Sequence, residues 1–223
     1  MRVLTADHAA APVTPGETVG DADIDALYAS DRPLLRLNFV TTLDGAANGP
    51  DGRSGTINSA ADHKGFTAMR RAADVLLVGA GTVRAESYGP ARTPIVVVSR
   101  RPDLPESARG AGVVLATTES SGAAEGDGVW VCGEEHVDLA RVITRARTAF
   151  GPHVLSEGGP TLAAELVAAG LVDELALSWT PHLVGGGRRA HPRLLDGADV
   201  DVALTSRHLL EEDGTLLGLW RVD

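Results

Sequence analysis

The feature that most constrains this chain is a series of short apolar runs, rich in Val and Leu, separated by turn residues. Runs such as VLLVG and IVVVS are apolar on both faces, as strands are when helices cover both sides of a parallel sheet. Each run is too short for a helix. The predicted strands are Leu34–Val40, Val75–Val78, Ile95–Val98, Val113–Ala116, Val129–Cys132, His153–Ser156 and Glu174–Trp179.

Helical segments fit between these strands. Ser59 can cap a helix that runs to about Ala73, with Asp62 as its capping-box partner, and Phe66, Met69 and Ala73 form the apolar stripe of that helix. The alternation of strands and helices predicts an α/β sheet. The other helices are expected near Asp21–Ala29, over Val137–Phe150 and from Pro160 to Gly170.

The end of the chain has a different pattern. Val202–Leu209 and Thr215–Arg221 flank Glu-Glu-Asp-Gly, which predicts a hairpin. We therefore expect one domain over 32–223, with a mostly parallel central sheet, helices on both faces and an antiparallel C-terminal hairpin. Residues 1–31 are expected to form an irregular arm and a short helix, used for surface packing or a dimer contact.

The composition argues against several classes of partner. The net charge of −10 disfavours nucleic acid and anionic membranes, although a local group of arginines can still bind a phosphorylated ligand. The single cysteine leaves no intrachain disulfide, and the histidine spacing suggests no metal site. Because no apolar run approaches the length of a membrane span and the N-terminus lacks a signal-peptide core, we expect a cytoplasmic protein.

Ser156–Leu162 (SEGGPTL) lies between a predicted strand and a predicted helix. Its glycines let a ligand approach the backbone, and the helix start offers free N–H groups to a pyrophosphate. A tight turn that needs glycine for its geometry is an equally good interpretation. Glu157 would repel a phosphate, so it is expected to bind a hydroxyl or amine; a simple helix N-terminal charge is the alternative.

Two further motifs follow predicted strands. Val78–Thr82 (VGAGT) resembles the start of a dinucleotide-binding fingerprint, but Arg84 takes the third glycine position, so a Rossmann fold is rejected. A glycine-rich turn beside a cofactor stays open. Ser99-Arg100-Arg101 could bind the 2′-phosphate of NADPH, or could be ordinary surface residues.

Acidic and basic residues near the middle of the chain give two more candidates. Within Glu86–Pro90 (ESYGP), a carboxylate beside an aromatic residue is a general acid if it is desolvated, and a solvated loop otherwise; Arg92 lies nearby. Arg70 falls beside Phe66 on the apolar stripe of its helix. An inward-facing arginine needs an anion, and a ligand phosphate or an internal carboxylate would each serve.

Taken in order, these motifs resemble the reductase domain of the bifunctional riboflavin-biosynthesis deaminase/reductase, within the dihydrofolate-reductase-like superfamily. The resemblance runs from about Arg32 to the C-terminus. The matching segments are Leu43–Gly45, Ser54–Ser59, Met69-Arg70, Gly79–Val83, Ser156–Leu162, Leu171–Leu175 and Pro181–Gly186.

The resemblance implies NADPH-dependent reduction of a 5-amino-6-ribosylaminouracil phosphate type of substrate to its ribitylamino form, by a homodimer. It places catalytic roles at Glu86 and Glu157. Substrate contacts are implied at Ser54, Arg70, Arg92 and Glu157. Cofactor contacts are implied at Val40, Thr56, Gly79, Gly81, Thr82, Glu86, Ser99, Arg100, Gly158, Gly159, Thr161 and Leu162, continuing to Glu165.

The sequence departs from the family in three places, and one of them is Thr56, where the family has a Trp or an equivalent residue before Ile57. The zinc-deaminase signature is absent, which indicates a stand-alone reductase. The family's Asp-containing motif after the glycine turn is replaced by Ala85–Pro90, with Glu86 in place of the Asp. This altered loop keeps two alternatives open: reduction of a dihydrofolate or dihydropterin, and a non-catalytic NADPH-binding module.

Overall fold

The computed structural model describes residues 1–7, 13–86, 88, 92–186 and 191–223. The strands are β1 Arg2–Ala6, β2 Leu34–Thr42, β3 Val75–Gly79, β4 Ile95–Val98, β5 Val113–Thr117, β6 Val129–Val131, β7 His153–Ser156, β8 Glu174–Thr180, β9 Leu204–Glu212 and β10 Thr215–Val222. The α-helices are α1 Asp21–Tyr28, α2 Ala60–Ala72, α3 Ala80–Glu86, α4 Leu139–Phe150 and α5 Pro160–Ala168.

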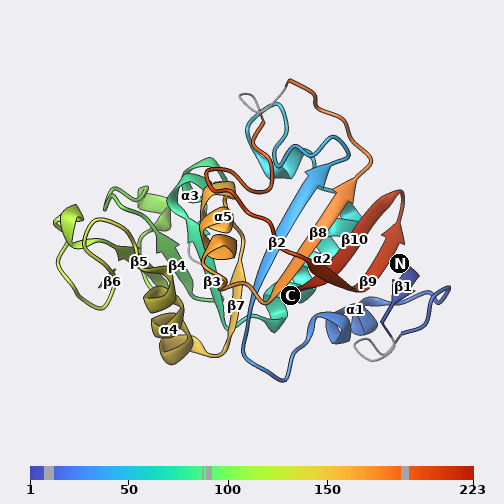
Figure 1. Ribbon diagram of the computed structural model, residues 1–223, viewed down its shortest axis with the longest axis horizontal. Helices are drawn as coiled ribbons and strands as arrows, with labels where there is room; N and C mark the ends of the chain where they lie inside the picture. Colours follow the sequence, from blue (N-terminus) through green and yellow to red (C-terminus); the bar gives the residue numbers. More distant parts are fainter. Residues whose placement is uncertain (8–12, 87, 89–91, 187–190) are drawn as a thin grey trace.

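All ten strands form one sheet in the order β1-β9-β10-β8-β2-β7-β3-β4-β5-β6 (Figure 1). The strands from β8 through β2 to β6 pair in parallel, whereas β10, β9 and β1 pair antiparallel. The predicted α/β architecture and the antiparallel C-terminal hairpin are confirmed. Asp213 and Gly214 in the hairpin turn both have positive φ, as a two-residue turn of this hand requires.

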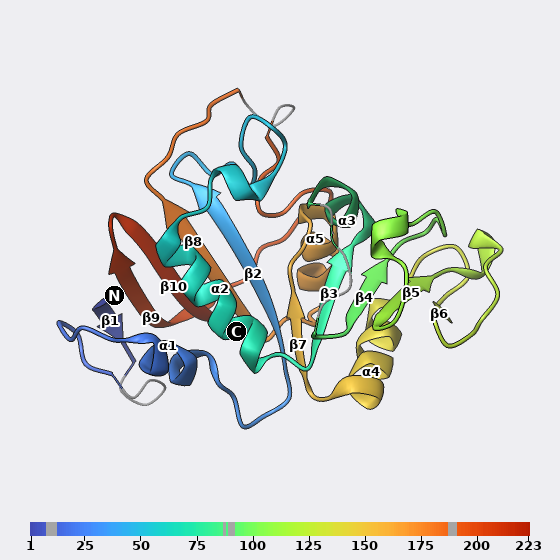
Figure 2. The same ribbon diagram turned by 180° about the vertical axis from the view of Figure 1, so that it is seen from behind.

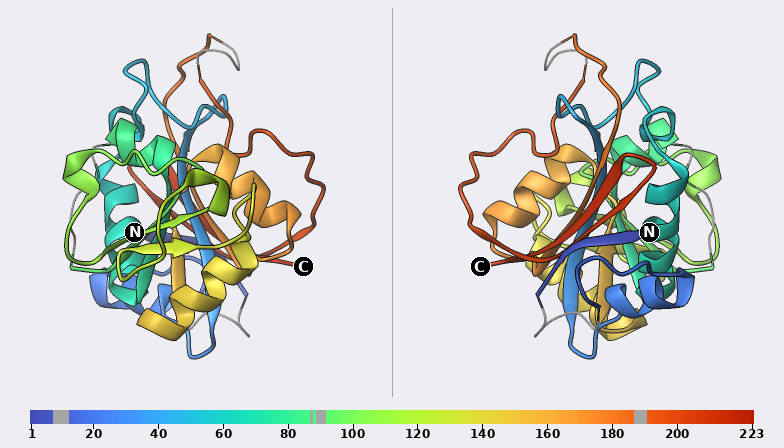
Figure 3. Two further views of the ribbon diagram at one scale, coloured as in Figure 1. Left: turned by 90° about the vertical axis from the view of Figure 1, so that its left-hand side faces the viewer. Right: turned by 90° about the vertical axis from the view of Figure 1, so that its right-hand side faces the viewer.

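Helices cover both faces of the sheet, as predicted for apolar strands. α1 and α2 lie on one face, and α4 and α5 lie on the other (Figures 1 to 3). Leu76 and Val78 of β3 pack in the core on the α2 side, together with Val83 of α3. Leu77, their neighbour on β3, packs in the opposite core with α4 and α5. This alternation is the reason that the central strands show no polar face in the sequence.

The expectation of an irregular N-terminal arm is wrong for its first residues. β1 pairs antiparallel with β9, and Val3 is only 1% exposed. β10 therefore lies inside the sheet between β9 and β8. Because β9 and β8 pair with both edges of β10, this apolar strand needs no partner subunit to cover it, and a homodimer stays a prediction.

Helix α2 packs Met69 and Ala73 against the core as predicted, but Phe66 departs from the expectation. Gly65, Ala68 and Met69 enter the core, while Phe66 stays half-buried and lines a cleft. The Ser59 hydroxyl accepts the Asp62 backbone N–H at 3.1 Å, as predicted. The reciprocal half of the capping box is not formed, because the Ser59 amide donates to Asn58 instead.

The unequal lengths of neighbouring strands create the space for a ligand. β7 ends at Ser156, which pairs with Leu37 of β2 and Leu77 of β3. β2 continues five residues further, to Thr42. Beyond the end of β7 the sheet is therefore split between β2 and β3, at the carboxyl edge where open α/β sheets bind ligands.

Candidate active site

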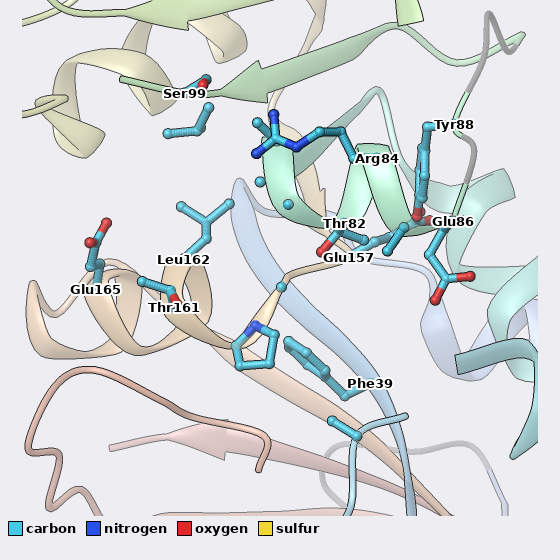
Figure 4. Close-up of a pocket in the computed structure, with 18 of the residues that line it drawn as sticks. Phe39, Thr82, Arg84, Glu86, Tyr88, Ser99, Glu157, Thr161, Leu162 and Glu165 are labelled. Carbon is cyan, nitrogen blue, oxygen red and sulfur yellow. The ribbon is translucent and has the colours of Figure 1, made fainter. Parts of the chain in front are cut away.

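A cleft of about 1660 Å³ occupies this split and extends past the ends of β3 and β4. Its wall includes residues from β2, α2, α3, the end of β4 and the start of α5. Figure 4 shows Glu86, Tyr88 and Glu157 gathered at one end, with Ser99, Thr161 and Glu165 toward the other. The two ends differ in chemistry.

The end of the cleft that contains Thr161 is formed by glycine-rich turns. Helix α5 begins at Pro160 after Gly159, and no side chain among the described residues caps its first turn. The amides of Thr161 and Leu162 are therefore available to bind an anion. Gly79, Gly81 and Thr82 line the same end. A Cβ built on Gly81 would have no atom within 4 Å, so the cleft reaches the backbone there.

Gly158 serves packing rather than the cleft. It is not among the cleft-lining residues, and its φ of +83° strains any other residue. A Cβ at this position would lie 2.7 Å from Cζ of Phe39. For Gly158, the interpretation as a turn that needs glycine for geometry therefore fits better than a direct ligand contact.

Cationic side chains meet the cleft at the end of β4. Ser99, Arg100 and Arg101 line it, together with Arg84 of α3. Arg100 and Arg101 are exposed, so they can turn toward an anion without losing an internal partner. The net acidity of the chain thus coexists with a local cationic patch.

The opposite end holds a buried ion pair. The Arg70 guanidinium binds Glu157 through two hydrogen bonds of 2.6 Å each, and the Tyr88 hydroxyl donates to the same carboxylate. Glu157 is 8% exposed. Burial, and then the charge of Glu157, raise the pKa of Tyr88, so Tyr88 is a donor at any physiological pH. The anionic partner required by Arg70 is thus an internal carboxylate.

Glu86 lies beside this ion pair on the same wall of the cleft (Figure 4). One oxygen of Glu86 accepts the backbone N–H of Ser54 at 2.7 Å. This bond ties helix α3 to the loop after β2 and brings the two predicted residues together. Val40 lines the cleft as well.

Three polar residues of the cleft did not emerge as ligand-binding residues from the sequence. Asp62, expected only to cap its helix, is 4% exposed and lines the cleft, as does Asn38 of β2. Burial raises the pKa of Asp62, and the neighbouring Ser178 hydroxyl partly offsets this effect. Tyr88 was noted only as a neighbour of Glu86. Its role depends on Glu157, which lies 69 positions away.

Two residues predicted for the site lie elsewhere. Thr56 is exposed, is not among the cleft-lining residues, and its hydroxyl binds Asp51 at 2.8 Å. Arg92 is exposed and does not line the cleft either. Ser87, Gly89 and Pro90 of the altered loop lie outside the described residues.

The part of the chain that the structure describes contains no group of three or more His, Cys, Asp or Glu side chains placed to hold a metal ion. Within the same residues, no helix combines the length and apolar character needed to cross a membrane.

Comparison with known proteins identifies relatives of the whole fold. The 2,5-diamino-6-ribosylamino-4(3H)-pyrimidinone 5′-phosphate reductase of Methanothermobacter thermautotrophicus is 31% identical over 193 residues, covering 76% of this chain and 87% of that protein. The riboflavin biosynthesis protein RibD of Mycobacterium tuberculosis is 32% identical over 165 residues, 69% of this chain and 44% of that protein. The chain thus matches less than half the length of that RibD.

Solved structures share the fold at low identity. A pyrimidine reductase-like protein of Corynebacterium diphtheriae superposes with a TM-score of 0.68 at 20% identity, covering 86% of this chain and 92% of that one. Dihydrofolate reductase of Enterococcus faecalis gives 0.52 at 13% identity, covering 85% and 96%. The predicted dihydrofolate-reductase-like fold is confirmed. The model of the RibD C-terminal domain family matches residues 33–214, and this chain therefore belongs to that family.

Proposed function

We propose that this chain is an NADPH-dependent reductase that converts the ribosylamino group of an aminopyrimidine phosphate into a ribitylamino group. One observation carries the proposal. A single cleft joins an anion-binding end, built from glycines, free helix amides and arginines, to an end where Arg70, Tyr88 and Glu157 form a polar cluster. The name of the Methanothermobacter relative describes such a reductase.

The residues at the anion-binding end fit a phosphorylated dinucleotide. The amides of Thr161 and Leu162 would bind the pyrophosphate, and the open space at Gly81 admits it to the backbone. Ser99 and Arg100 lie at the end of β4, where they would bind a 2′-phosphate and so favour NADPH over NADH. Bound in this cleft, NADPH would supply the hydride.

The other end of the cleft would hold and protonate the substrate. Glu157, fixed by Arg70 and Tyr88, has an acceptor set suited to the ribose hydroxyls. Reduction of the ring-opened imine of the sugar would require one proton at the imine nitrogen. Glu86, held by the Ser54 amide, is the proposed donor, directly or through a water. The protein contributes mainly alignment of the two reactants.

The decisive assay follows NADPH oxidation by absorbance with the ribosylaminopyrimidine phosphate, with NADH and with dihydrofolate as parallel arms. Turnover of the pyrimidine with a preference for NADPH is expected. Turnover of dihydrofolate alone would transfer the assignment to a dihydrofolate or dihydropterin reductase. Binding of NADPH with no turnover of either compound would leave a non-catalytic NADPH-binding module.

The acid role of Glu86 has its own test. Glu86→Gln keeps an acceptor for the Ser54 amide but has no carboxyl proton. We expect turnover to fall about 10²-fold or more, the usual contribution of a general acid, with the dissociation constant of NADPH unchanged. Unchanged turnover would remove Glu86 from the acid role.

Two further expectations concern the molecule as a whole. We propose a homodimer located in the cytoplasm, on the resemblance to the reductase family. Light scattering coupled to size-exclusion chromatography tests the first: a mass of twice 23.1 kDa is expected, and a monomer at all concentrations contradicts it.

A further inference from the structure

Helix α3 carries a cationic side chain that has no assigned role in the proposed reaction. Arg84 is exposed and lines the cleft, and among the described residues it has no hydrogen bond or ion pair. Figure 4 shows its side chain extending from α3 toward Ser99, which follows β4. A guanidinium group and a hydroxyl therefore approach the same part of the cleft from two separate elements.

The side chain of Ser99 lies on the face of the sheet that α3 covers. Val97 of β4 packs in the same core as α3, whereas Val98 packs in the core that α4 and α5 cover. The ladder continues to Ser99, whose amide still donates to β5 at 3.0 Å. Alternation therefore places Ser99 on the Val97 face, and Arg100, one position later, is directed away from it. Arg84 is the arginine that shares the face of Ser99.

The order of the strands separates this pair from the helix amides at the start of α5. β3 lies between β4 and β7, the strand that precedes α5, so the ends of β4 and β7 are two strand spacings apart, about 10 Å. The Ser99 oxygen accepts the Arg101 amide at 3.1 Å, which leaves the Ser99 O–H free to donate. With a guanidinium that can bind two oxygens, this hydroxyl forms a site for a second phosphate, distinct from the pyrophosphate proposed at α5.

We propose that Arg84, together with the Ser99 hydroxyl, binds the 2′-phosphate of NADPH and is the residue that makes this chain prefer NADPH to NADH. A 2′-phosphate fits because it lies one ribose away from the pyrophosphate and is the group that NADH lacks. The inference rests on the proposed cofactor and deepens it. It moves the arginine of this site from Arg100, which the resemblance implied, to Arg84 on α3, and leaves Arg100 a general positive potential.

The test measures the dissociation constants of NADPH and NADH by fluorescence titration. Two nucleotides without a nicotinamide ring, 2′,5′-ADP and 5′-AMP, isolate the phosphate contact and are compared by calorimetry. We expect the wild-type protein to favour NADPH and 2′,5′-ADP. In Arg84→Gln, the affinity for these two compounds should fall about 10- to 100-fold, the usual effect of losing hydrogen bonds to a charged group, while the affinity for NADH and 5′-AMP stays within twofold.

Further variants separate this contact from a general loss of charge. Ser99→Ala should lower the preference for NADPH severalfold, and Arg100→Gln should lower it less than Arg84→Gln does. Arg141→Gln is the matched control, because Arg141 is an exposed arginine of α4 that does not line the cleft, and its preference should equal that of the wild-type protein. Because Arg84 has no internal partner among the described residues, the melting temperature of Arg84→Gln should be unchanged.

The outcomes distinguish this inference from the proposed function. Equal losses of NADPH and NADH affinity in Arg84→Gln would place Arg84 at the pyrophosphate and overturn the inference, and so would a larger change of preference in Arg100→Gln. NADPH-dependent reduction of the pyrimidine would stand in both cases. The expected titrations without turnover of the pyrimidine would overturn the proposed reaction and leave the role of Arg84 standing. Binding of neither dinucleotide overturns both proposals.

Discussion

At the residue scale, Asp62 illustrates how a buried carboxyl group in the wall of the cleft can cost stability. Burial raises the pKa of Asp62 above the ordinary value of 3.8. A raised pKa means that the protonated form fits the fold better, so the contribution of Asp62 to stability is complete below about pH 3.8. That contribution is lost as the pH rises through the pKa of the folded protein.

Asp62→Asn is therefore expected to melt higher than the wild-type protein at neutral pH. A chain of this length gains about 2–4 °C for each kcal/mol, and the gain should shrink as the pH falls toward 3.8. Thermal unfolding across this pH range, with Asp23→Asn as the control for a charge at the helix start, checks it. A gain that is independent of pH would contradict the assignment to ionisation.

For Glu157 the prediction concerns activity rather than stability, because its charge is paired with that of Arg70. Glu157→Gln replaces one oxygen by an NH₂ group that cannot accept from Arg70 or Tyr88. We expect kcat/KM for the pyrimidine substrate to fall about 10- to 100-fold, as for the loss of a hydrogen bond to a charged group. NADPH affinity, measured by fluorescence titration, should stay within twofold. A loss of NADPH affinity as large as the loss of kcat/KM would place Glu157 in the cofactor site instead.

At the element scale, a substitution at the start of α3 tests the proposed cofactor site directly. Gly81 is exposed at the second position of this helix, and no atom lies within 4 Å of the position that a Cβ would take. Gly81→Ala should leave stability unchanged or raise it by about 0.5–1 kcal/mol. If NADPH approaches the backbone here, the added methyl group should raise its dissociation constant about tenfold.

The control for Gly81→Ala is Gly128→Ala, in the loop before β6. Gly128 also has open space at the Cβ position but does not line the cleft. Titration of both variants with NADPH, together with their melting temperatures, gives the comparison. Equal NADPH affinity in Gly81→Ala and the wild-type protein would place the cofactor away from α3.

The sequence predicts most of these elements because their signals are local. Apolar runs bounded by turn residues mark the central strands, and Pro160 marks the start of α5. β1 was missed because its five residues include polar Arg2 and Thr5, and its partner strand lies about 200 positions away. The core face of α2 was misplaced at Phe66 because a helical pattern alone does not show which side meets the sheet and which meets a cleft.

At the scale of the whole molecule, the site could be predicted only where one motif supplies a complete part of it. The glycine turn and helix start at Gly159–Leu162 are contiguous, so the role proposed for them could be predicted from the sequence. The pair of Arg70 and Glu157 is 87 positions apart, and the sequence left the partner of Arg70 open. Asp62 was missed because its helix-start position already explained a carboxylate there.

The N-terminal strand provides a test of whether the sheet unfolds as one unit. Val3 is 1% exposed between β9 and the core, and removing two buried methyl groups with Val3→Ala should cost about 2 kcal/mol, or about 4–8 °C. Because the ten strands share one sheet, circular dichroism and the fluorescence of Trp130, in the distant strand β6, should report the same lowered midpoint. The fluorescence is measured with Trp179 and Trp220 replaced by Phe, so that Trp130 is the remaining tryptophan. If circular dichroism gives a lowered midpoint while Trp130 melts as in the wild-type protein, the chain unfolds as separate units. An unchanged midpoint by both probes would mean that the packing of Val3 in β1 contributes nothing to the stability of the sheet.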